Sequence, residues 1–171
     1  MSDEAPVLYV LDANVLMEAH RRYYAFDLCP GFWECLEHYC GEGCVVSIDR
    51  VRDEVQDGDA LADWVASAPE AFFVSTAEPE VVRLYQDIMA WVQSQPQFLE
   101  AAKARFARGA DGWLIAYAHW RGATVVTHER YDRNVRKKVP IPNVCREFGV
   151  SYRDTFDMLR SLEVRFGWAA A

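Results

Sequence analysis

The sequence lacks the segments that mark membrane and secreted proteins. No apolar run is long enough to span a bilayer, and residues 1–6 carry no basic segment of the kind that opens a secretory signal. The sequence also has no internal repeat, no low-complexity segment and no linker. We therefore expect one soluble, cytoplasmic domain that spans residues 1–171.

Positive charge is scarce overall. The formal net charge of −8 argues against broad, nonspecific binding to polyanions. The charge is unevenly distributed, however. Residues 49–63 hold six acidic and two basic side chains, net −4, whereas residues 130–138 hold five basic side chains and one acidic one, net +4. Either run alone is as consistent with a solvated face as with a binding surface.

The sequence has no C-x-x-C pair and an odd number of cysteines. Four of the five cysteines lie between Cys29 and Cys44, near His38, and the fifth is Cys145. A zinc site is one interpretation of this cluster, but the spacings fit no standard zinc finger. We expect buried, unpaired thiols of a reducing compartment.

Apolar residues are plentiful, at 51% of the chain, and they fall into short runs. The runs predict strands at residues 7–11, 44–48, 72–74, 123–127 and 149–152. Helical patterns cover residues 14–23, 32–39, 49–55, 61–65, 79–93, 98–108, 112–120, 143–148 and 154–163. This alternation predicts the α/β class, with a parallel sheet that is covered by helices on both sides.

Turn and capping residues supply the expected boundaries. Asp49, Asn143 and Asp154 each precede a helical pattern and are candidate N-caps. Gly58 is expected to break the short helix after Asp49, and Gly122 is expected to end the nearly apolar helix over residues 112–120.

Acidic side chains stand where these elements would meet. Asp12 and Glu129 come directly after predicted buried strands, Glu54 lies on the helix after a third strand, and Asp111 opens a buried helix. Because ligands of parallel sheets bind beyond the carboxyl ends of the strands, we expect the four acids to converge there. Asn14 and Thr127 flank them in sequence.

Converging carboxylates predict a cation. They repel one another unless a cation lies among them, and an oxygen-only ligand set suits Mg²⁺ or Mn²⁺. Such an ion activates water and polarises a phosphoryl oxygen. With basic residues at the rim, the pattern favours phosphodiester hydrolysis; the candidate RNA-backbone contacts are Arg130, Arg133, Arg136, Lys137 and Lys138.

Each acid also has a simpler interpretation. Asp12 is a good N-cap, and Asp111 favours the dipole of its helix or caps it. Glu54 belongs to an acidic run that is typical of solvated surface. Glu129 alone is a loop acid, and Asp132 competes with it for the fourth position. Only the joint arrangement is specific.

The chain resembles a known family over most of its length. The resemblance rests on Asp12-Ala13-Asn14 after a strand, on Glu54, on Asp111 before a helix that contains Trp-Leu-Ile-Ala-Tyr-Ala, and on Val-Val-Thr-His-Glu129. This pattern resembles PIN domains. Residues 11–37 and 138–145 are similar to a PIN-like subgroup that is catalogued as a domain of unknown function.

The resemblance implies a three-layer α/β/α sandwich and a metal-dependent endoribonuclease. Many bacterial relatives are toxins of type II toxin–antitoxin pairs, often dimeric, so it also implies a cognate antitoxin and a homodimer. It transfers metal binding and catalysis to Asp12, Glu54, Asp111 and Glu129, and gives Asn14 and Thr127 orienting roles behind them. Two residues depart from the family pattern: Ala13 replaces a frequent Thr, and Glu129 replaces a frequent Asp.

Two other functions compete with this prediction. A strand followed by Asp-x-Asn also occurs near the nucleophilic Asp of phosphatases, but those usually have a second Asp where Asn14 stands, and a receiver-like phosphoacceptor lacks its paired acids here. A non-catalytic module that binds RNA or protein is the other alternative. His128 is a candidate proton carrier beside Glu129, although a single loop histidine is more often uninvolved.

Overall fold

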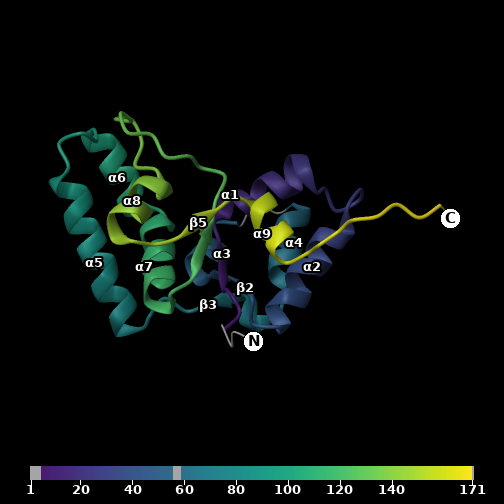
Figure 1. Cartoon of the computed structure of the whole chain (residues 1–171). Helices are drawn as coiled ribbons and strands as arrows, with labels where there is room; N and C mark the ends of the chain where they lie inside the picture. Colours follow the sequence, from purple (N-terminus) through teal and green to yellow (C-terminus); the bar gives the residue numbers. More distant parts are fainter. Residues whose placement is uncertain (1–4, 56–58, 171) are drawn as a thin grey trace.

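A five-stranded parallel sheet forms the centre of the computed structural model, which describes residues 5–55 and 59–170 (Figure 1). Its strands are β1 (Tyr9–Leu11), β2 (Val45–Ile48), β3 (Phe73–Val74), β4 (Thr124–Val126) and β5 (Tyr152–Arg153). Their order across the sheet is β3-β2-β1-β4-β5, and every pairing is parallel. The expected parallel α/β class is therefore confirmed.

Strand β1 lies in the middle of the sheet because both of its edges are paired. Tyr9 is in register with Val45 of β2 and with Thr124 of β4. Val10 and Leu11 have no exposed surface, which agrees with the continuous apolar run that predicted a strand buried on both faces. This register fixes where the residues after β1 and β4 emerge.

Helices flank the sheet on both sides, so the molecule has the expected three layers. Helices α5, α6, α7 and α8 lie on the left in Figure 1 and α2, α4 and α9 on the right. The helical segments are α1 (Ala13–Glu18), η1 (Ala19–Tyr23), α2 (Pro30–Gly41), α3 (Asp49–Glu54), α4 (Ala60–Ser67), η2 (Glu70–Phe72), α5 (Pro79–Ser94), α6 (Glu100–Arg108), α7 (Asp111–Arg121), α8 (Ile141–Phe148) and α9 (Thr155–Ser161).

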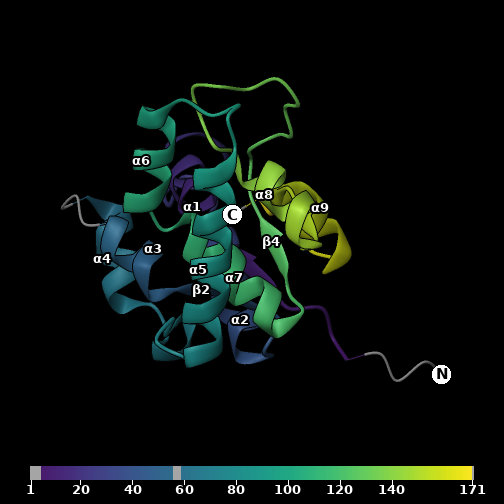
Figure 2. The same cartoon turned by 90° about the vertical axis from the view of Figure 1, so that its left-hand side faces the viewer.

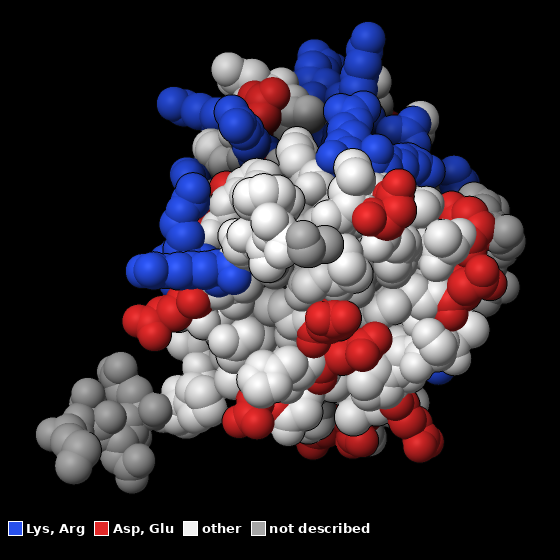
Figure 3. All heavy atoms as spheres, turned by 90° about the vertical axis from the view of Figure 1, so that its right-hand side faces the viewer, with Lys and Arg blue, Asp and Glu red and all other residues white. Residues whose placement is uncertain are grey.

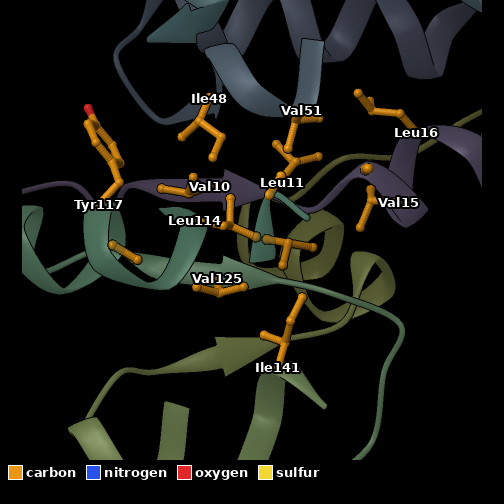
Figure 4. Close-up of a cluster of buried hydrophobic side chains, with 14 of the residues drawn as sticks. Val10, Leu11, Val15, Leu16, Ile48, Val51, Leu114, Tyr117, Val125 and Ile141 are labelled. Carbon is orange, nitrogen blue, oxygen red and sulfur yellow. The ribbon is translucent and has the colours of Figure 1, made fainter. Parts of the chain in front are cut away.

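The hydrophobic core joins the layers directly beneath the carboxyl ends of the strands. Leu114 of α7 and Ile141 of α8 pack near Leu11 and Val125 of the neighbouring strands (Figure 4). All four side chains are completely buried. Since interiors pack at nearly crystalline density, this core holds the start of α7 and the loop before α8 at fixed distances from the sheet.

Some expected boundaries are wrong. Asn143 is not an N-cap: α8 begins at Ile141, after Pro140, and the Asn143 amide instead donates to the carbonyl of Asp132 (2.8 Å). Asp49 is the first helical residue of α3 rather than its cap. Gly149, expected in a strand, ends α8 in the left-handed conformation (φ 66°), which a glycine adopts without steric cost.

Other expected boundaries are confirmed. Asp154 is the N-cap of α9, where its carboxylate accepts a hydrogen bond from the backbone of Asp157 (2.8 Å). Gly122 ends α7 in the left-handed conformation. The helix expected after Asn14 forms, although its second half, η1, is a π-helix. The expected break at Gly58 lies outside the described residues.

All five cysteines are free thiols. Burial raises the pKa of the Cys145 thiol to about 12 and that of Cys35 to about 11, so both stay protonated at neutral pH. Within residues 5–55 and 59–170, no helix combines the length and the apolar character that a membrane crossing requires.

Candidate active site

The candidate site begins where β1 and β4 end side by side. Asp12 follows β1 and Thr127 follows β4, and the backbone N–H of Asp12 donates to Val126 (3.0 Å). This pairing brings the hydroxyl of Thr127 within 3.1 Å of Oδ2 of Asp12, to which it donates. Asp12 occupies the N-cap position of α1, but its side chain makes no capping hydrogen bond. Its carboxylate is therefore available for another role.

Asp12 is buried in a negatively charged environment. Only 2% of its surface is exposed. Burial, and after it the charge of Glu129, raises the pKa of Asp12 to about 7, although the Thr127 hydrogen bond opposes the shift. At neutral pH the protein thus holds a carboxyl group whose charge is poorly compensated.

Asp111 is a second, partly buried acid near Asp12. It is the first residue of α7, and its cap position is taken by Ala110. Its pKa is raised well above the ordinary value by burial and then by the charges of Asp12, Glu129 and Glu54. The electrostatic environment of Asp111 thus includes the three other candidate acids.

Glu54 connects the cluster to the start of α7. It is the last residue of α3, and its Oε1 accepts a hydrogen bond from the backbone N–H of Ala110 (2.8 Å). The contact places the Glu54 charge next to Asp111, which follows Ala110 directly. Glu54 is exposed, as its acidic run would favour, and it also makes this hydrogen bond to the start of α7.

Glu129 is held from three directions. Its backbone N–H donates to the Thr127 hydroxyl (3.1 Å), and its Oε2 accepts from the backbone N–H of Ile141 (2.8 Å). Its Oε1 forms an ion pair with Nζ of Lys138 at 2.6 Å, and only 8% of the side chain is exposed. The competing acid, Asp132, is exposed and accepts a hydrogen bond within its own loop, from the backbone N–H of Asn134.

The cluster contains the right donors for a hard divalent cation. The two carboxyl groups with raised pKa values, Asp12 and Asp111, would release their protons to such an ion, and all four side chains offer oxygen only. In the part of the chain that the structure describes, no three His, Cys, Asp or Glu side chains form a ready-made metal group. The donor set thus fits Mg²⁺ or Mn²⁺ in chemistry, and the ligand geometry is not preset.

Two further candidate residues lie near the cluster in different ways. Asn14 is exposed in the first turn of α1, two residues after Asp12. The ring of His128 has its Nε2 within 3.1 Å of the Thr155 hydroxyl and packs against Tyr23 and Phe156. His128 therefore contacts α9 and η1, and its hydrogen bond is made to Thr155.

The basic segment between β4 and α8 forms the loop at the top of Figure 2. Arg130, Arg133, Arg136 and Lys137 are exposed along it, as an RNA-binding role would require, whereas Lys138 turns inward to Glu129. On the face shown in Figure 3, basic side chains gather at the same upper end and acidic ones below.

Sequence reasoning missed a hollow next to the acids. It has a volume of about 510 Å³, and its wall includes Thr127 and Glu129. Arg146 from α8 and Arg153 from β5 line it together with tyrosines. No spacing in the sequence joins these residues, because they come from separate elements.

Comparisons with known proteins agree with this architecture. The family described as "Domain of unknown function (DUF4411)" matches residues 9–166. No curated protein matches the sequence. A chain in the "Crystal structure of VapBC2 from Rickettsia felis bound to a DNA fragment from their promoter" is similar in structure, with a TM-score of 0.52 and 14% identity. The similarity covers 86% of this chain and 98% of that one, and at this identity it concerns the fold.

Proposed function

The chain belongs to the family described as domain of unknown function DUF4411, and from this starting point we propose that it is a PIN-like, metal-dependent endoribonuclease. The observation that carries the proposal is the acid cluster at the carboxyl ends of β1 and β4. Asp12 is buried and Asp111 partly buried there, both with raised pKa values, a state that a divalent cation would relieve.

Four acids would hold the cofactor: Asp12, Glu54, Asp111 and Glu129. When bound, Mg²⁺ or Mn²⁺ supplies an activated water and neutralises charge on a phosphodiester. The chain supplies the positioning. Thr127 orients the Asp12 carboxylate, and Glu54 holds the start of α7, from which Asp111 projects. Asn14, exposed beside Asp12, is the remaining candidate for an orienting role.

RNA would approach from the basic end of the molecule. Arg130, Arg133, Arg136 and Lys137 are exposed on the loop that leads out of the cluster. Guanidinium and ammonium groups on such a loop bind phosphates without reading sequence. The acidic remainder of the surface confines the polyanion to this end, which is consistent with the net charge of −8.

We further propose that the chain is the toxin of a toxin–antitoxin pair and acts in the cytoplasm. The resemblance to PIN domains and the fold shared with VapBC2 support this assignment. A cognate antitoxin or a second copy of the chain needs apolar surface to bind. Leu28 (83% exposed) and Trp168 (89% exposed) offer such surface away from the acids.

The competing enzyme class fits the chain less well. A phosphatase of the aspartate type usually has a second Asp two residues after the nucleophile, where this chain has the exposed Asn14. A non-catalytic binding module predicts no binding of metal by the acids. Titration calorimetry with Mn²⁺ separates this module from the nuclease: the nuclease predicts binding heat that disappears in Asp12→Asn.

Cleavage of RNA tests the proposal directly. We expect purified protein to cut a single-stranded RNA in Mg²⁺ or Mn²⁺, and EDTA or Asp111→Asn to abolish the cut. Asp87→Asn, an exposed acid on α5, is the matched control and should leave the rate unchanged. Sequencing of RNA ends after expression in cells would then locate the sites. Identical ends from the wild type and Asp111→Asn would contradict the nuclease assignment.

A further inference from the structure

The hollow beside the acid cluster has the size of a small-ligand site. Its volume of about 510 Å³ lies within the usual range for binding pockets, roughly 300–1,000 Å³. Its wall combines the end of η1, the segment after β4, α8, β5 and the start of α9. Five separate segments of the chain therefore define its shape, and a scaffold of this kind suits specific recognition.

The pocket shares residues with the candidate active site. Thr127 and Glu129 belong to its wall, and the Thr127 hydroxyl donates to Asp12. A ligand in the pocket would thus lie beside the acids, separated from Asp12 by one side chain. The pocket is placed to hold a group that is covalently next to the reacting phosphodiester.

The pocket wall carries three arginines and three carboxylates. Arg130, Arg146 and Arg153 line it, and none of them forms an ion pair within residues 5–55 and 59–170. Of the carboxylates, Glu129 pairs with Lys138 and Asp157 with Arg160, and Asp154 caps α9. Exposed guanidinium groups with no carboxylate partner favour an anionic ligand.

One of these arginines, Arg146, contacts two tyrosines of the pocket wall. The guanidinium carbon of Arg146 lies 3.8 Å from the centre of the Tyr131 ring, and its Nε donates to the Tyr152 hydroxyl at 3.2 Å. Tyr131 and Tyr152 hold the guanidinium plane in one orientation. A planar cation stacked on a tyrosine is the kind of platform on which unpaired nucleobases stack.

We propose that this pocket binds one nucleotide of single-stranded RNA, directly next to the phosphodiester that is cut. The Tyr131–Arg146 pair stacks on the base, and Arg130 and Arg153 bind the adjoining phosphates. The inference rests on the proposed nuclease function, because RNA is the substrate there. It adds a defined subsite to a basic loop that otherwise contacts only the backbone.

Binding to a fluorescein-labelled eight-nucleotide RNA tests the subsite. The measurement is fluorescence anisotropy with the Asp111→Asn variant, so that no RNA is cut during the titration. In this background we expect Tyr131→Ala and Arg146→Ala each to weaken binding roughly fivefold or more, the loss of one base-stacking contact. Tyr131→Phe keeps the ring and should bind within about twofold of the parent.

Arg121→Ala is the matched control. Arg121 is also exposed and also lies over tyrosine and tryptophan rings, but it ends α7 while Asp111 begins it. About 15 Å of helix separates the two positions. If Arg121→Ala weakens binding as much as Arg146→Ala, the effect is general electrostatics and the subsite is overturned. Unchanged binding in both Tyr131→Ala and Arg146→Ala overturns it as well.

The failure of the two proposals can be told apart. If the wild type cuts RNA with metal but the pocket variants bind and cut normally, the result supports the nuclease proposal and contradicts the nucleotide subsite. If RNA binding depends on Tyr131 and Arg146 while no metal-dependent cleavage occurs, the result supports nucleotide binding in the pocket and contradicts the nuclease proposal. Thermal unfolding of each variant identifies any loss that comes from misfolding.

Discussion

Nζ of Lys138 lies 2.6 Å from Oε1 of Glu129, so a loop lysine forms an ion pair at the edge of the acid cluster. The charge of Lys138 also lowers the pKa of Asp111, but burial and the charges of the neighbouring acids raise this pKa by more. The side chain of Lys138 is half exposed (51%), whereas that of Glu129 is nearly buried. The chain thus provides one positive charge of its own where a divalent cation is expected to bind.

Removal of this charge should strengthen metal binding. We expect Lys138→Met to lower the Kd for Mn²⁺ by roughly threefold or more, since a neighbouring positive charge repels the ion and occupies Glu129. Lys137→Met is the control, because Lys137 is exposed and belongs to the same loop. Titration calorimetry measures both. Weaker binding in Lys138→Met would mean that Lys138 orients Glu129 rather than competing with the ion.

The stability of the metal-free protein should depend on pH through Asp12. Its folded pKa of about 7 is above the ordinary value of 3.8, so the folded state binds more protons than the unfolded state between these values. The free energy of unfolding therefore falls as pH rises from 4 to 7, by about 2–3 kcal/mol from Asp12 alone between pH 5 and pH 8.

Urea unfolding in EDTA at a series of pH values checks this prediction. Asp12→Asn should make the pH profile flatter and stabilise the protein most at pH 8, whereas Asp87→Asn should leave the slope unchanged. Saturating Mn²⁺ should raise stability at pH 8 more than at pH 5. An equally steep slope in Asp12→Asn would show that the effect comes from other groups.

Glu54 combines a structural role with a predicted metal role, and two substitutions separate them. Glu54→Gln keeps an oxygen that accepts from Ala110 but loses the charge, so it should bind metal at least about tenfold more weakly with little change in stability. Glu54→Ala loses both the charge and the hydrogen-bond acceptor, so it should also lower the free energy of unfolding by about 1 kcal/mol. Titration calorimetry measures the metal affinity, and urea unfolding measures the stability. Equal metal binding in Glu54→Gln and the wild type would remove Glu54 from the ligand set.

Thr127 should act on metal binding through Asp12. Its hydroxyl donates to Asp12 and accepts from the backbone of Glu129, and Thr127→Val removes both bonds at nearly constant volume. We expect metal affinity to fall by roughly 10- to 100-fold. Thr127→Ser restores the hydroxyl and should recover most of the affinity. If Thr127→Ser and Thr127→Val bind metal with the same affinity, the Thr127 hydroxyl does not position the Asp12 carboxylate.

Local sequence pattern predicted the central strand and the buried helix beside which two of the candidate acids lie. The apolar run before Asp12 predicted a buried central strand, and the apolar segment after Asp111 predicted a buried helix that starts at that residue. Both succeed because burial imposes its pattern over a few consecutive residues. The end of each strand then indicated where acidic side chains would meet.

Long-range packing decided the rest. The sequence assigned Asn143 to a helix cap, but in the fold its side chain donates a hydrogen bond to Asp132. The ion pair between Lys138 and Glu129 was likewise not predicted from the sequence. A polar side chain takes the partner that is nearest in space, and that partner depends on how the loop between β4 and α8 closes against the sheet. The residues that neighbour Lys138 and Asn143 in sequence therefore do not indicate which partners these side chains contact.

The sequence by itself determined a parallel α/β chain with acids at the ends of its strands. Only the tertiary structure decided that Arg146 of α8 stacks on Tyr131 of the loop before that helix, in a pocket whose wall includes Thr127 beside Asp12. The physical reason is that hydrophobic periodicity is a local property, whereas the meeting of side chains from different elements depends on strand register and on the packing of helices against the sheet.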